Sequence, residues 1–458
     1  MAQIFKPKAQ SRNNKSRKHK SKGRQLADFI GVVSDYDPKA KGIIKTDDGR
    51  VAFVTGALKG EEVKVRPQTY TDKIIEAQVI DVLTPSEKRL TPDCPVFNDC
   101  GGCQLQYMPD DEQVSAKQHA FNGLIQKQLK IDNVPWQPAL IANPWHYRRT
   151  ARLVTWVHSN GKVSLGFRQE KSKHIVDINA CPVLVKSLSD LISPLQQLLQ
   201  SLAQKKAITH VQLFHLEGED SVVFRAPDNL TLPDRTALVN FAQQHKTTVL
   251  LEAQKDKFEL LFTAHDNAGS QLKYQYKGIN YEFTANNFIQ VNHQINELMI
   301  EQALNWLNVQ SDDTVLDLFS GIGNFTLPLA KQAANVIAVE GVNDMVKKIA
   351  SNAKLNDCKN VKAFQADLSK LDEKYKPQWL KPIDKLLLDP ARDGAYAVVK
   401  KIPILKPKTI LYVSCNPTTM IRDLKVLLNA DYRLTKLGLL NMFPQTSHVE
   451  AMALLELK

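Results

Sequence analysis

The amino-acid sequence predicts a multidomain protein in which a small β-barrel and a central α+β domain precede a doubly wound α/β domain. Three patterns predict this fold class. Short β-like segments crowd residues 25–85, strand and helix patterns mix over 86–272, and apolar strands alternate with helices over 273–458. A chain of 458 residues is also too long for one ordinary hydrophobic core.

The composition is that of a soluble globular protein, with 43% hydrophobic and 24% charged residues. No apolar run is long enough to span a bilayer, and the basic N-terminus lacks the apolar segment of a secretory signal. We therefore expect a cytoplasmic monomer without a membrane partner. The six cysteines are sparse and unevenly spaced, which does not predict a disulfide framework.

Positive charge is concentrated at the N-terminus. The first 27 residues hold nine lysines and arginines and no acid, and they supply most of the formal net charge of +12. Because such a segment cannot bury apolar surface, we expect residues 1–24 to form a disordered tail. A salt-sensitive arm for phosphate backbones and a merely solubilising tail both fit this composition.

Residues 25–85 contain five short strand patterns separated by turn signals. The patterns are Phe29–Ser34, Gly42–Lys45, Val51–Val54, Glu61–Pro67 and Ile74–Leu83. Five short strands suit an OB-like barrel, a common platform for nucleic acid, although an SH3-like structural barrel fits as well. The stretch VTGALKGEEVKVR resembles the TRAM domain, an RNA-binding OB-like barrel of some RNA-modifying enzymes.

Four cysteines in the next region are candidate ligands of an inorganic group: Cys94, Cys100, Cys103 and, much later, Cys181. Four thiolates suit tetrahedral zinc or an iron–sulfur cluster. Zinc ribbons carry two Cys-x2-Cys pairs, and this chain has one. The Gly-Gly between Cys100 and Cys103 permits the tight backbone wrap that a bulky cluster needs. The pattern therefore favours a [4Fe–4S] cluster over zinc, with unrelated free thiols as the third alternative.

The remainder of 86–272 reads as an α+β domain. Helix patterns occupy 108–131, 183–203 and 234–245, and strand patterns occupy 146–180, 210–225 and 248–262. Arginines alternate with aromatic residues in the first strand region, for example at Arg148, Arg152 and Trp156. Such a surface could stack bases and hold phosphates, but surface charges over core aromatics would give the same pattern.

From about residue 275 the pattern predicts a parallel, doubly wound, Rossmann-like sheet covered on both faces. The expected strands are 314–319, 336–339, 361–364, 385–388, 409–414, 433–442 and 451–455. Ligands of such sheets bind at the carboxyl ends of the strands.

The first of these strands ends in a turn with Gly321 and Gly323, but position 326 is Thr, so the dinucleotide fingerprint is incomplete. Glu340 ends the second strand, where it could accept both hydroxyls of a ribose, and Asp367 follows the third, within reach of an adenine. This ordered set indicates S-adenosylmethionine. Asp367 alone is equally explained as a helix cap.

Cys415 follows the fifth strand and precedes Asn416-Pro417, which would cap and start a helix. The helix N-terminus would lower the pKa of the thiol and make it a nucleophile. The alternative is a buried structural cysteine. Asp389 ends the fourth strand beside the same place, and Glu450 lies just before the last strand, where it is a candidate base or an ordinary surface residue.

A thiolate and a base suit methylation at C5 of uracil. That carbon is a poor nucleophile until a thiolate adds to C6 and makes C5 enolate-like. A base must afterwards remove the C5 proton so that elimination frees the cysteine.

Nearly all of the chain after the tail resembles the bacterial 23S ribosomal RNA uracil-5-methyltransferases of the RlmD type. The specific motifs are CPVFNDCGGC with Cys181, FIQVN, LDLFSGIGNF, LLLDPAR, YVSCNP and FPQTSHVE. One departure is Ser320, where relatives often carry cysteine. The resemblance implies Cys415 as nucleophile, Glu450 as base, and a [4Fe–4S] cluster on Cys94, Cys100, Cys103 and Cys181. It implies S-adenosylmethionine contacts from Gln290, Phe319, Asn324, Glu340, Asp367 and Asp389.

The resemblance further implies that the barrel and the cysteine domain hold folded RNA while the target uridine is flipped into the catalytic pocket. The cluster would be structural, since the reaction needs no electron. A uracil-5-methyltransferase acting on tRNA, an enzyme for another ribosomal uridine and a non-catalytic RNA-binding factor are the alternatives. Enzymes for tRNA generally lack the barrel and the cysteines, and the set of Cys415, Glu450 and Asp389 disfavours a non-catalytic protein.

Overall fold

The computed structural model describes residues 26–170, 172–227, 230–264, 269–371 and 377–458, so the predicted tail 1–24 lies outside the described residues. The chain divides into two compact units, Met1–Arg89 and Leu90–Lys458. The stretches 86–272 and 273–458, separated in the sequence analysis, therefore belong to one compact unit apart from residues 86–89.

The first unit is a six-stranded sheet in the order β1-β5-β6-β4-β3-β2. Its strands are β1 (Phe29–Val32), β2 (Asp35–Tyr36), β3 (Gly42–Lys45), β4 (Val51–Thr55), β5 (Glu62–Tyr70) and β6 (Ile74–Thr84). β4 and β6 pair in parallel and the other neighbours are antiparallel. The ends of the sheet, β1 and β2, are successive segments of one stretch of chain. Alternate residues such as Ile44, Val54 and Val63 form its buried core.

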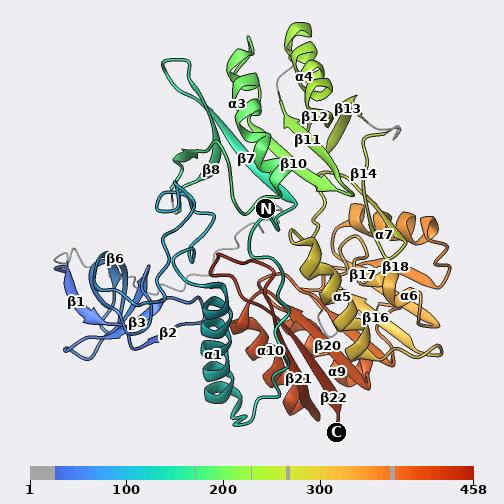
Figure 1. Ribbon diagram of the computed structural model, residues 1–458. Coiled ribbons are helices and arrows are strands. Elements are labelled where there is room, and N and C mark those ends of the chain that lie inside the picture. The colour runs from blue at the N-terminus through green and yellow to red at the C-terminus, as the bar shows by residue number, and fades with distance from the viewer. Residues whose placement is uncertain (1–25, 171, 228–229, 265–268, 372–376) are drawn as a thin grey trace, which may run out of the picture. The chain divides into compact units, whose positions relative to one another are not determined.

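The second unit contains a seven-stranded sheet in the order β13-β12-β11-β10-β7-β8-β9 (Figure 1). Its strands are β7 (Thr150–Val157), β8 (Val163–Arg168), β9 (Ile175–Asp177), β10 (His210–Leu216), β11 (Glu219–Arg225), β12 (Thr248–Gln254) and β13 (Lys257–Phe262). Helices α2 (Lys186–Asp190), α3 (Ile192–Ser201) and α4 (Leu232–His245) share one apolar core with this sheet. These elements fall where the sequence predicted strands and helices.

A second seven-stranded sheet has the order β18-β17-β16-β19-β20-β22-β21. Its strands are β16 (Thr314–Leu318), β17 (Asn335–Glu340), β18 (Val361–Gln365), β19 (Lys385–Leu388), β20 (Thr409–Ser414), β21 (Tyr432–Leu440) and β22 (Glu450–Leu457). The first five strands are parallel, as predicted. The prediction of a parallel sheet is wrong for β22, which runs antiparallel to both of its neighbours, β20 and β21.

Helices cover both faces of this sheet, as the doubly wound prediction requires. Along β20, Ile410 and Tyr412 point into one core while Leu411 and Val413 point into the other. The first core holds α8 (Tyr396–Val399), α9 (Ile402–Leu405) and α10 (Pro417–Asn429). The second holds α5 (His293–Leu307), α6 (Thr326–Ala330) and α7 (Asn343–Leu355).

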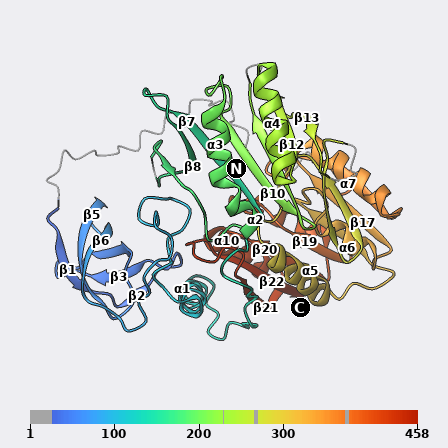
Figure 2. The same cartoon turned by 45° about the horizontal axis from the view of Figure 1, so that its top comes forward.

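Helix α1 (Asp110–Leu129) comes from the early part of the second unit but packs on the late sheet. Its Phe121 and Ile125 are fully buried in the core that also holds α10, and Figures 1 and 2 both show α1 beside α10. A hairpin that the sequence analysis missed, β14 (Leu272–Tyr276) and β15 (Ile279–Phe283), packs in the opposite core. Among the described residues, no helix combines the length and the apolarity required to cross a bilayer.

Candidate active site

The turn after β16 is shaped by backbone that only a few residue types adopt readily. Gly321 and Gly323 have φ of +59° and +98°, and Phe319 also has a positive φ, of +65°. Glu340, at the end of β17, holds this turn: its two carboxylate oxygens accept from the amides of Gly321 at 3.0 Å and Val342 at 2.9 Å. The predicted cofactor residues Phe319 and Glu340 therefore meet at one edge of the sheet.

Asp317 is a buried carboxyl directly beneath the same turn, and the sequence analysis gave it no role. Its Oδ2 accepts from the hydroxyl of Thr326 at 2.5 Å, while Oδ1 has no hydrogen-bond partner. Burial raises its pKa to about 7, and the nearby Asp389 and Glu340 add to the effect. Thr326, which replaces the third fingerprint glycine, thus fixes the start of α6.

Asn324 belongs to the glycine turn itself, whereas Gln290 lies in the segment before α5. Asn324 exchanges side-chain hydrogen bonds with Asn296 of α5, at 2.9 and 3.2 Å. Gln290 is buried, and its carbonyl accepts from Nε of Arg149 at 2.9 Å. The Arg149 guanidinium also lies 4.7 Å from the ring centre of Tyr274.

Asp367 is the predicted cofactor residue with the weakest structural support. It is exposed two residues beyond β18, and it accepts from the amide and hydroxyl of Ser369 at 3.1 and 2.6 Å. Hydrogen bonds from Lys370 and Ser369 lower its pKa. These local bonds are those of a turn, since no helix begins here among the described residues, and the helix cap considered from the sequence is not found.

Cys415 lies at the carboxyl end of β20, and α10 begins two residues later. As predicted, Asn416 caps this helix by accepting from the Thr418 amide at 3.1 Å, and Pro417 is its first residue. The prediction of a lowered thiol pKa is wrong. Burial, followed by the charges of Glu450 and Asp389, raises the pKa of Cys415 to about 11, against a smaller opposing effect of Arg392.

Glu450 is the first residue of β22 and is only 5% exposed, so it is no ordinary surface residue. Its Oε2 has no hydrogen-bond partner. Burial and the neighbouring Asp389 raise the pKa of Glu450 to about 8, and burial raises that of Asp389 to about 7. Cys415, Asp389 and Glu450 therefore form one cluster of mutually interacting acids at the sheet edge.

A buried carboxylate ties the loop after Asp389 to the helix after Cys415. Asp423 of α10 is fully buried and accepts from the Ala395 amide at 2.6 Å, from Tyr412 Oη at 2.8 Å and from Arg422 Nε at 2.8 Å. The carbonyl of Arg392 accepts from the side chains of Asn416 and Thr419, at 2.9 and 3.1 Å. The sequence alone did not reveal this network.

We expect Asp423→Asn to destabilise the protein. The amide would present N–H groups to donors that now meet carboxylate oxygens, at a cost of about 1–3 kcal/mol for each buried donor left unsatisfied. Tyr412→Phe removes a single donor and should cost less. Thermal unfolding measures how much each variant is destabilised. An Asp423→Asn variant that melts at the same temperature as the wild type would contradict the prediction.

The four candidate cysteine ligands are near enough to influence one another electrostatically. Each of the six pairs of thiols interacts electrostatically, and burial together with these neighbours raises the pKa of Cys103 to about 12. Cys100 Sγ accepts from the Gly102 amide at 3.4 Å. Within the described ranges, no three histidines, cysteines or acids are close enough to hold a single metal ion.

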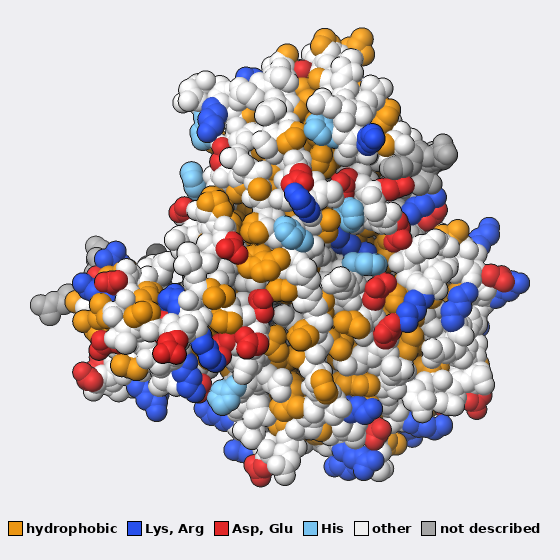
Figure 3. All heavy atoms as spheres, viewed as in Figure 1, with side chains coloured by type: hydrophobic (Ala, Val, Ile, Leu, Met, Phe, Trp, Pro, Cys, Tyr) orange, Lys and Arg blue, Asp and Glu red, His pale blue; other side chains and the backbone are white. Residues whose placement is uncertain are grey.

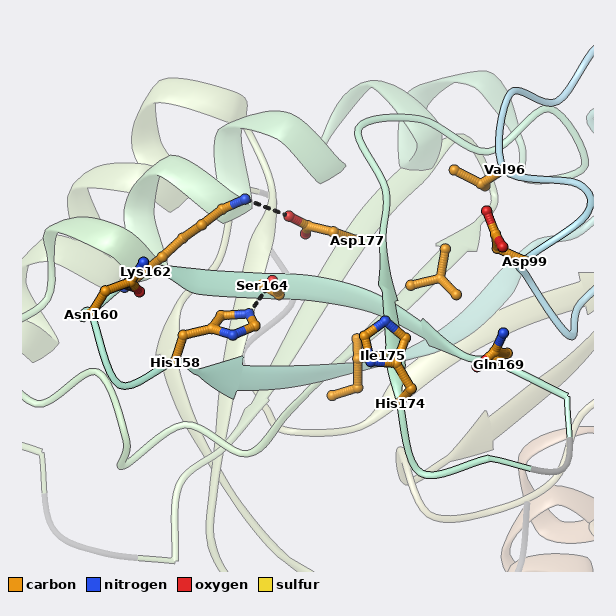
Figure 4. Close-up of a pocket in the computed structure, with 11 residues that line it drawn as sticks. Val96, Asp99, His158, Asn160, Lys162, Ser164, Gln169, His174, Ile175 and Asp177 are labelled. Atoms are coloured by element: carbon orange, nitrogen blue, oxygen red, sulfur yellow. Dashed lines mark hydrogen bonds and ion pairs between the residues drawn. The ribbon is translucent and has the colours of Figure 1, made fainter.

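A surface pocket beside the cysteine segment has a volume of about 530 Å³ and is lined by none of the candidate site residues (Figure 4). Val96 and Asp99 form one wall, and residues of β8, β9 and their flanking loops form the rest. Its polar groups largely satisfy one another: Lys162 pairs with Asp177 at 3.4 Å, and His158 is hydrogen-bonded to Ser164 at 2.9 Å. On the face in Figure 3, basic and acidic side chains of the second unit are interspersed.

Comparison with known proteins agrees with the motifs. A family model described as tRNA (uracil-5-)-methyltransferase matches residues 111–458. A Shewanella woodyi protein named 23S rRNA (uracil(1939)-C(5))-methyltransferase RlmD is 42% identical, with 100% of both chains covered. A protein of the same name from Shewanella halifaxensis is also 42% identical over both full lengths.

The fold is similar to the crystal structure of Pyrococcus abyssi tRNA (uracil-54, C5)-methyltransferase in complex with S-adenosyl-L-homocysteine. The TM-score is 0.70, with 23% sequence identity over 93% of this chain and 99% of that chain. The two proteins therefore share one fold over nearly the whole chain. On the family match and the full-length relatives together, the protein belongs to the tRNA (uracil-5-)-methyltransferase family.

Proposed function

We propose that this protein transfers a methyl group from S-adenosylmethionine to C5 of one uridine in 23S ribosomal RNA. One observation carries the proposal: Cys415, Asp389 and Glu450 interact at the carboxyl edge of a doubly wound sheet, beside the glycine turn. The full-length relatives named for 23S rRNA favour ribosomal RNA as substrate and suggest the uridine that corresponds to position 1939.

Five residues around the glycine turn would hold the cofactor: Gln290, Phe319, Asn324, Glu340 and Asp389. Phe319, Asn324, Glu340 and Asp389 fit this task because they follow or end neighbouring parallel strands at the carboxyl edge of the sheet. Gln290 is included on the resemblance of its motif. Asp367 would join them only after giving up its bonds to Ser369 and Lys370. When bound, S-adenosylmethionine supplies a sulfonium methyl group that an enolate-like carbon can attack.

Cys415 would act first. Its thiolate forms a bond to C6 of the flipped uracil, and the C5–C6 double-bond electrons become available at C5, which takes the methyl group. Because its pKa is raised, the thiol must lose its proton as the nucleotide binds, and Arg392 is the cation that favours the thiolate.

Glu450 would act second. After methylation, C5 carries a methyl group and one proton, and the Glu450 carboxylate removes that proton. The electrons left at C5 re-form the C5–C6 double bond as the C6–sulfur bond breaks, which returns Cys415 as a thiolate. Asp389, whose pKa is also raised, would serve the cofactor, and its charge contributes to the raised pKa of Glu450.

We further propose that the sheet of the first unit is an OB-like barrel of the TRAM type that binds folded RNA. Its order supports this, because the end strands β1 and β2 are continuous in the chain and so close the sheet. Binding to ribosomal RNA would place the protein in the cytoplasm.

The cysteines would hold a [4Fe–4S] cluster as a structural element. The four thiols influence one another electrostatically, and the Gly-Gly between Cys100 and Cys103 permits the tight backbone wrap that a bulky cluster needs. We expect the anaerobically purified protein to be brown, with broad visible absorption that Cys103→Ser abolishes. A colourless wild-type protein containing zinc would contradict the cluster.

The proposed substrate is tested by mapping 5-methyluridine in ribosomal RNA from cells with and without the gene, and after complementation. We expect one uridine of 23S rRNA to lose its methyl group in the deletion strain and to regain it on complementation. Purified protein should methylate a 23S rRNA fragment and not tRNA. Methylation of tRNA alone would support the tRNA alternative, and an unchanged methylation map would contradict the proposed function.

A further inference from the structure

The loop that leads to Glu450 is buried although it has no regular secondary structure. Residues 441–449 connect β21 to β22, and Met442 and Gln445 in this loop are 0% and 2% exposed. Backbone N–H and C=O groups in a buried loop cannot rely on water, so protein groups must satisfy them. The identity of those groups decides what holds the candidate base in place.

The partners of this loop come from much earlier in the chain. The Gln445 carbonyl accepts from the amides of Gln104 and Leu105, at 2.9 and 3.0 Å. The Ser447 amide donates to Gln104 Oε1 at 3.3 Å, and Tyr147 Oη donates to the Pro444 carbonyl at 3.0 Å. The last two bonds join residues that are 343 and 297 positions apart.

Gln445 forms a reciprocal pair with Gln113 of α1. The Gln445 amide donates to Gln113 Oε1 at 2.9 Å, and Gln113 Nε2 donates back to Gln445 Oε1 at 3.0 Å. Gln445 Nε2 also donates to Asp110 Oδ1 at 2.7 Å. Gln113 is fully buried, so these bonds do not compete with water. A shorter or apolar side chain at position 445 could not make both side-chain hydrogen bonds, to Gln113 and to Asp110.

The backbone of Gln445 is itself strained. Its φ of +64° lies in the left-handed region, which costs a residue other than glycine on the order of 1–3 kcal/mol. Such a conformation persists only when the surroundings overdetermine it. Here five hydrogen bonds to four residues do so: two to the carbonyl, one from the amide and two through the side chain.

We propose that Gln445, held by Gln113 and Asp110 of α1, is a positioning residue for the base Glu450. The inference rests on the proposed function of Glu450. A general base must lie within hydrogen-bond reach of the proton that it removes, and an error of about 1 Å can cost on the order of 100-fold in rate. Glu450 is five residues beyond Gln445 and pairs with Leu440, so the loop that Gln445 anchors is closed at both ends beside the base. Cys415 is positioned separately, by β20 and α10.

This arrangement separates the two steps of the reaction. Loosening the loop should slow the removal of the C5 proton, while addition of Cys415 to C6 should proceed almost normally. The covalent enzyme–RNA adduct would then accumulate during turnover. A residue that only stabilises the fold would lower adduct formation and turnover together.

The test compares turnover with adduct formation on the same 23S rRNA fragment, the adduct being resolved on a denaturing gel. Gln445→Gly removes the side-chain bonds while glycine accepts the left-handed backbone. We expect turnover to fall about 10–100-fold, the rate of adduct formation to stay close to that of the wild type, and the steady-state adduct fraction to rise. Gln113→Ala breaks the same pair from α1 and should behave alike, so the test stands even if one variant does not fold.

Gln310→Ala is the matched control, because this exposed glutamine bonds Asn308 outside the site and its loss should change neither rate. A parallel fall of turnover and adduct formation in Gln445→Gly and Gln113→Ala, or unchanged turnover in both, would overturn the positioning role. Glu450→Gln in the same assay tests the base separately. If that variant fails to accumulate adduct, the proposed base is wrong, whatever Gln445 does.

Discussion

Cys415→Ser should abolish methylation and leave RNA binding largely intact. Serine presents a hydroxyl of far higher pKa than the thiol, in a site whose burial and carboxylates already oppose a negative charge. Loss of a covalent nucleophile lowers turnover by factors of about 10⁴ or more. The side chain is half-buried at a strand end and its replacement is nearly isosteric, so the RNA surface should be unchanged.

Two measurements check this prediction. Incorporation of labelled methyl groups into a 23S rRNA fragment reports turnover, and a gel-shift titration at fixed salt concentration reports binding. RNA carrying 5-fluorouridine at the target adds a third, because fluorine cannot leave C5 as the proton does and the wild-type enzyme should be trapped as a covalent adduct. Cys415→Ser should give no adduct.

Cys358→Ser is the control, since this buried cysteine lies in the core beside α7 and its thiol donates to the Asn356 carbonyl at 3.6 Å. It should retain methylation and trapping. Methylation by Cys415→Ser at the wild-type rate would remove the covalent mechanism altogether.

The position of Cys415 could be predicted from sequence because local chemistry decides it. An apolar run defines β20, and Asn416-Pro417 must start a helix directly after it. In a parallel sheet that junction lies at the ligand edge, together with the ends of β16, β17 and β19. The same reasoning placed Glu340 and Asp389 correctly at strand ends.

The pKa of Cys415 could not be predicted in this way. The helix N-terminus is a local feature, whereas burial and the charges of Glu450 and Asp389 depend on how separate strands pack. The anchoring of Gln445 by Gln113 and Asp110 is beyond sequence reasoning for the same reason, since α1 packs against the distant late sheet.

The antiparallel end of the sheet is a different kind of error, because a local signal was present. Only nine residues, 441–449, connect β21 to β22. A parallel connection needs a crossover of a dozen or more residues, usually with a helix. Loop length therefore required antiparallel pairing, and with it the placement of Glu450 at the start of a strand beside Cys415.

Glu450→Gln should lose turnover while keeping the first chemical step. The amide cannot accept the C5 proton, so addition and methyl transfer should proceed and elimination should stop. We expect a methylated enzyme–RNA adduct to accumulate to about one equivalent per active site, with multiple turnover lowered on the order of 10²–10⁴-fold. A denaturing gel with methyl-labelled cofactor measures both, and normal turnover would contradict the role of this residue.

The wild-type reaction should accelerate as the pH rises from 6 to 9, because the pKa of Glu450 near 8 leaves the base protonated at lower pH. Stability should change in the opposite direction. A carboxyl whose pKa is raised by folding binds more protons in the native state than in the unfolded state between about pH 4.5 and 8, so the free energy of unfolding falls as the pH rises through that window.

Glutamine carries no charge at any of these pH values, so Glu450→Gln should escape this loss of stability. Its melting temperature should match that of the wild type near pH 4 and exceed it increasingly up to about pH 8, where the difference corresponds to a few kcal/mol at most. Melting curves of both proteins from pH 5 to 9 measure this gap in melting temperature. A gap that stays constant with pH would show that Glu450 does not titrate in this range, and would contradict the raised pKa on which the expected pH dependence of the rate rests.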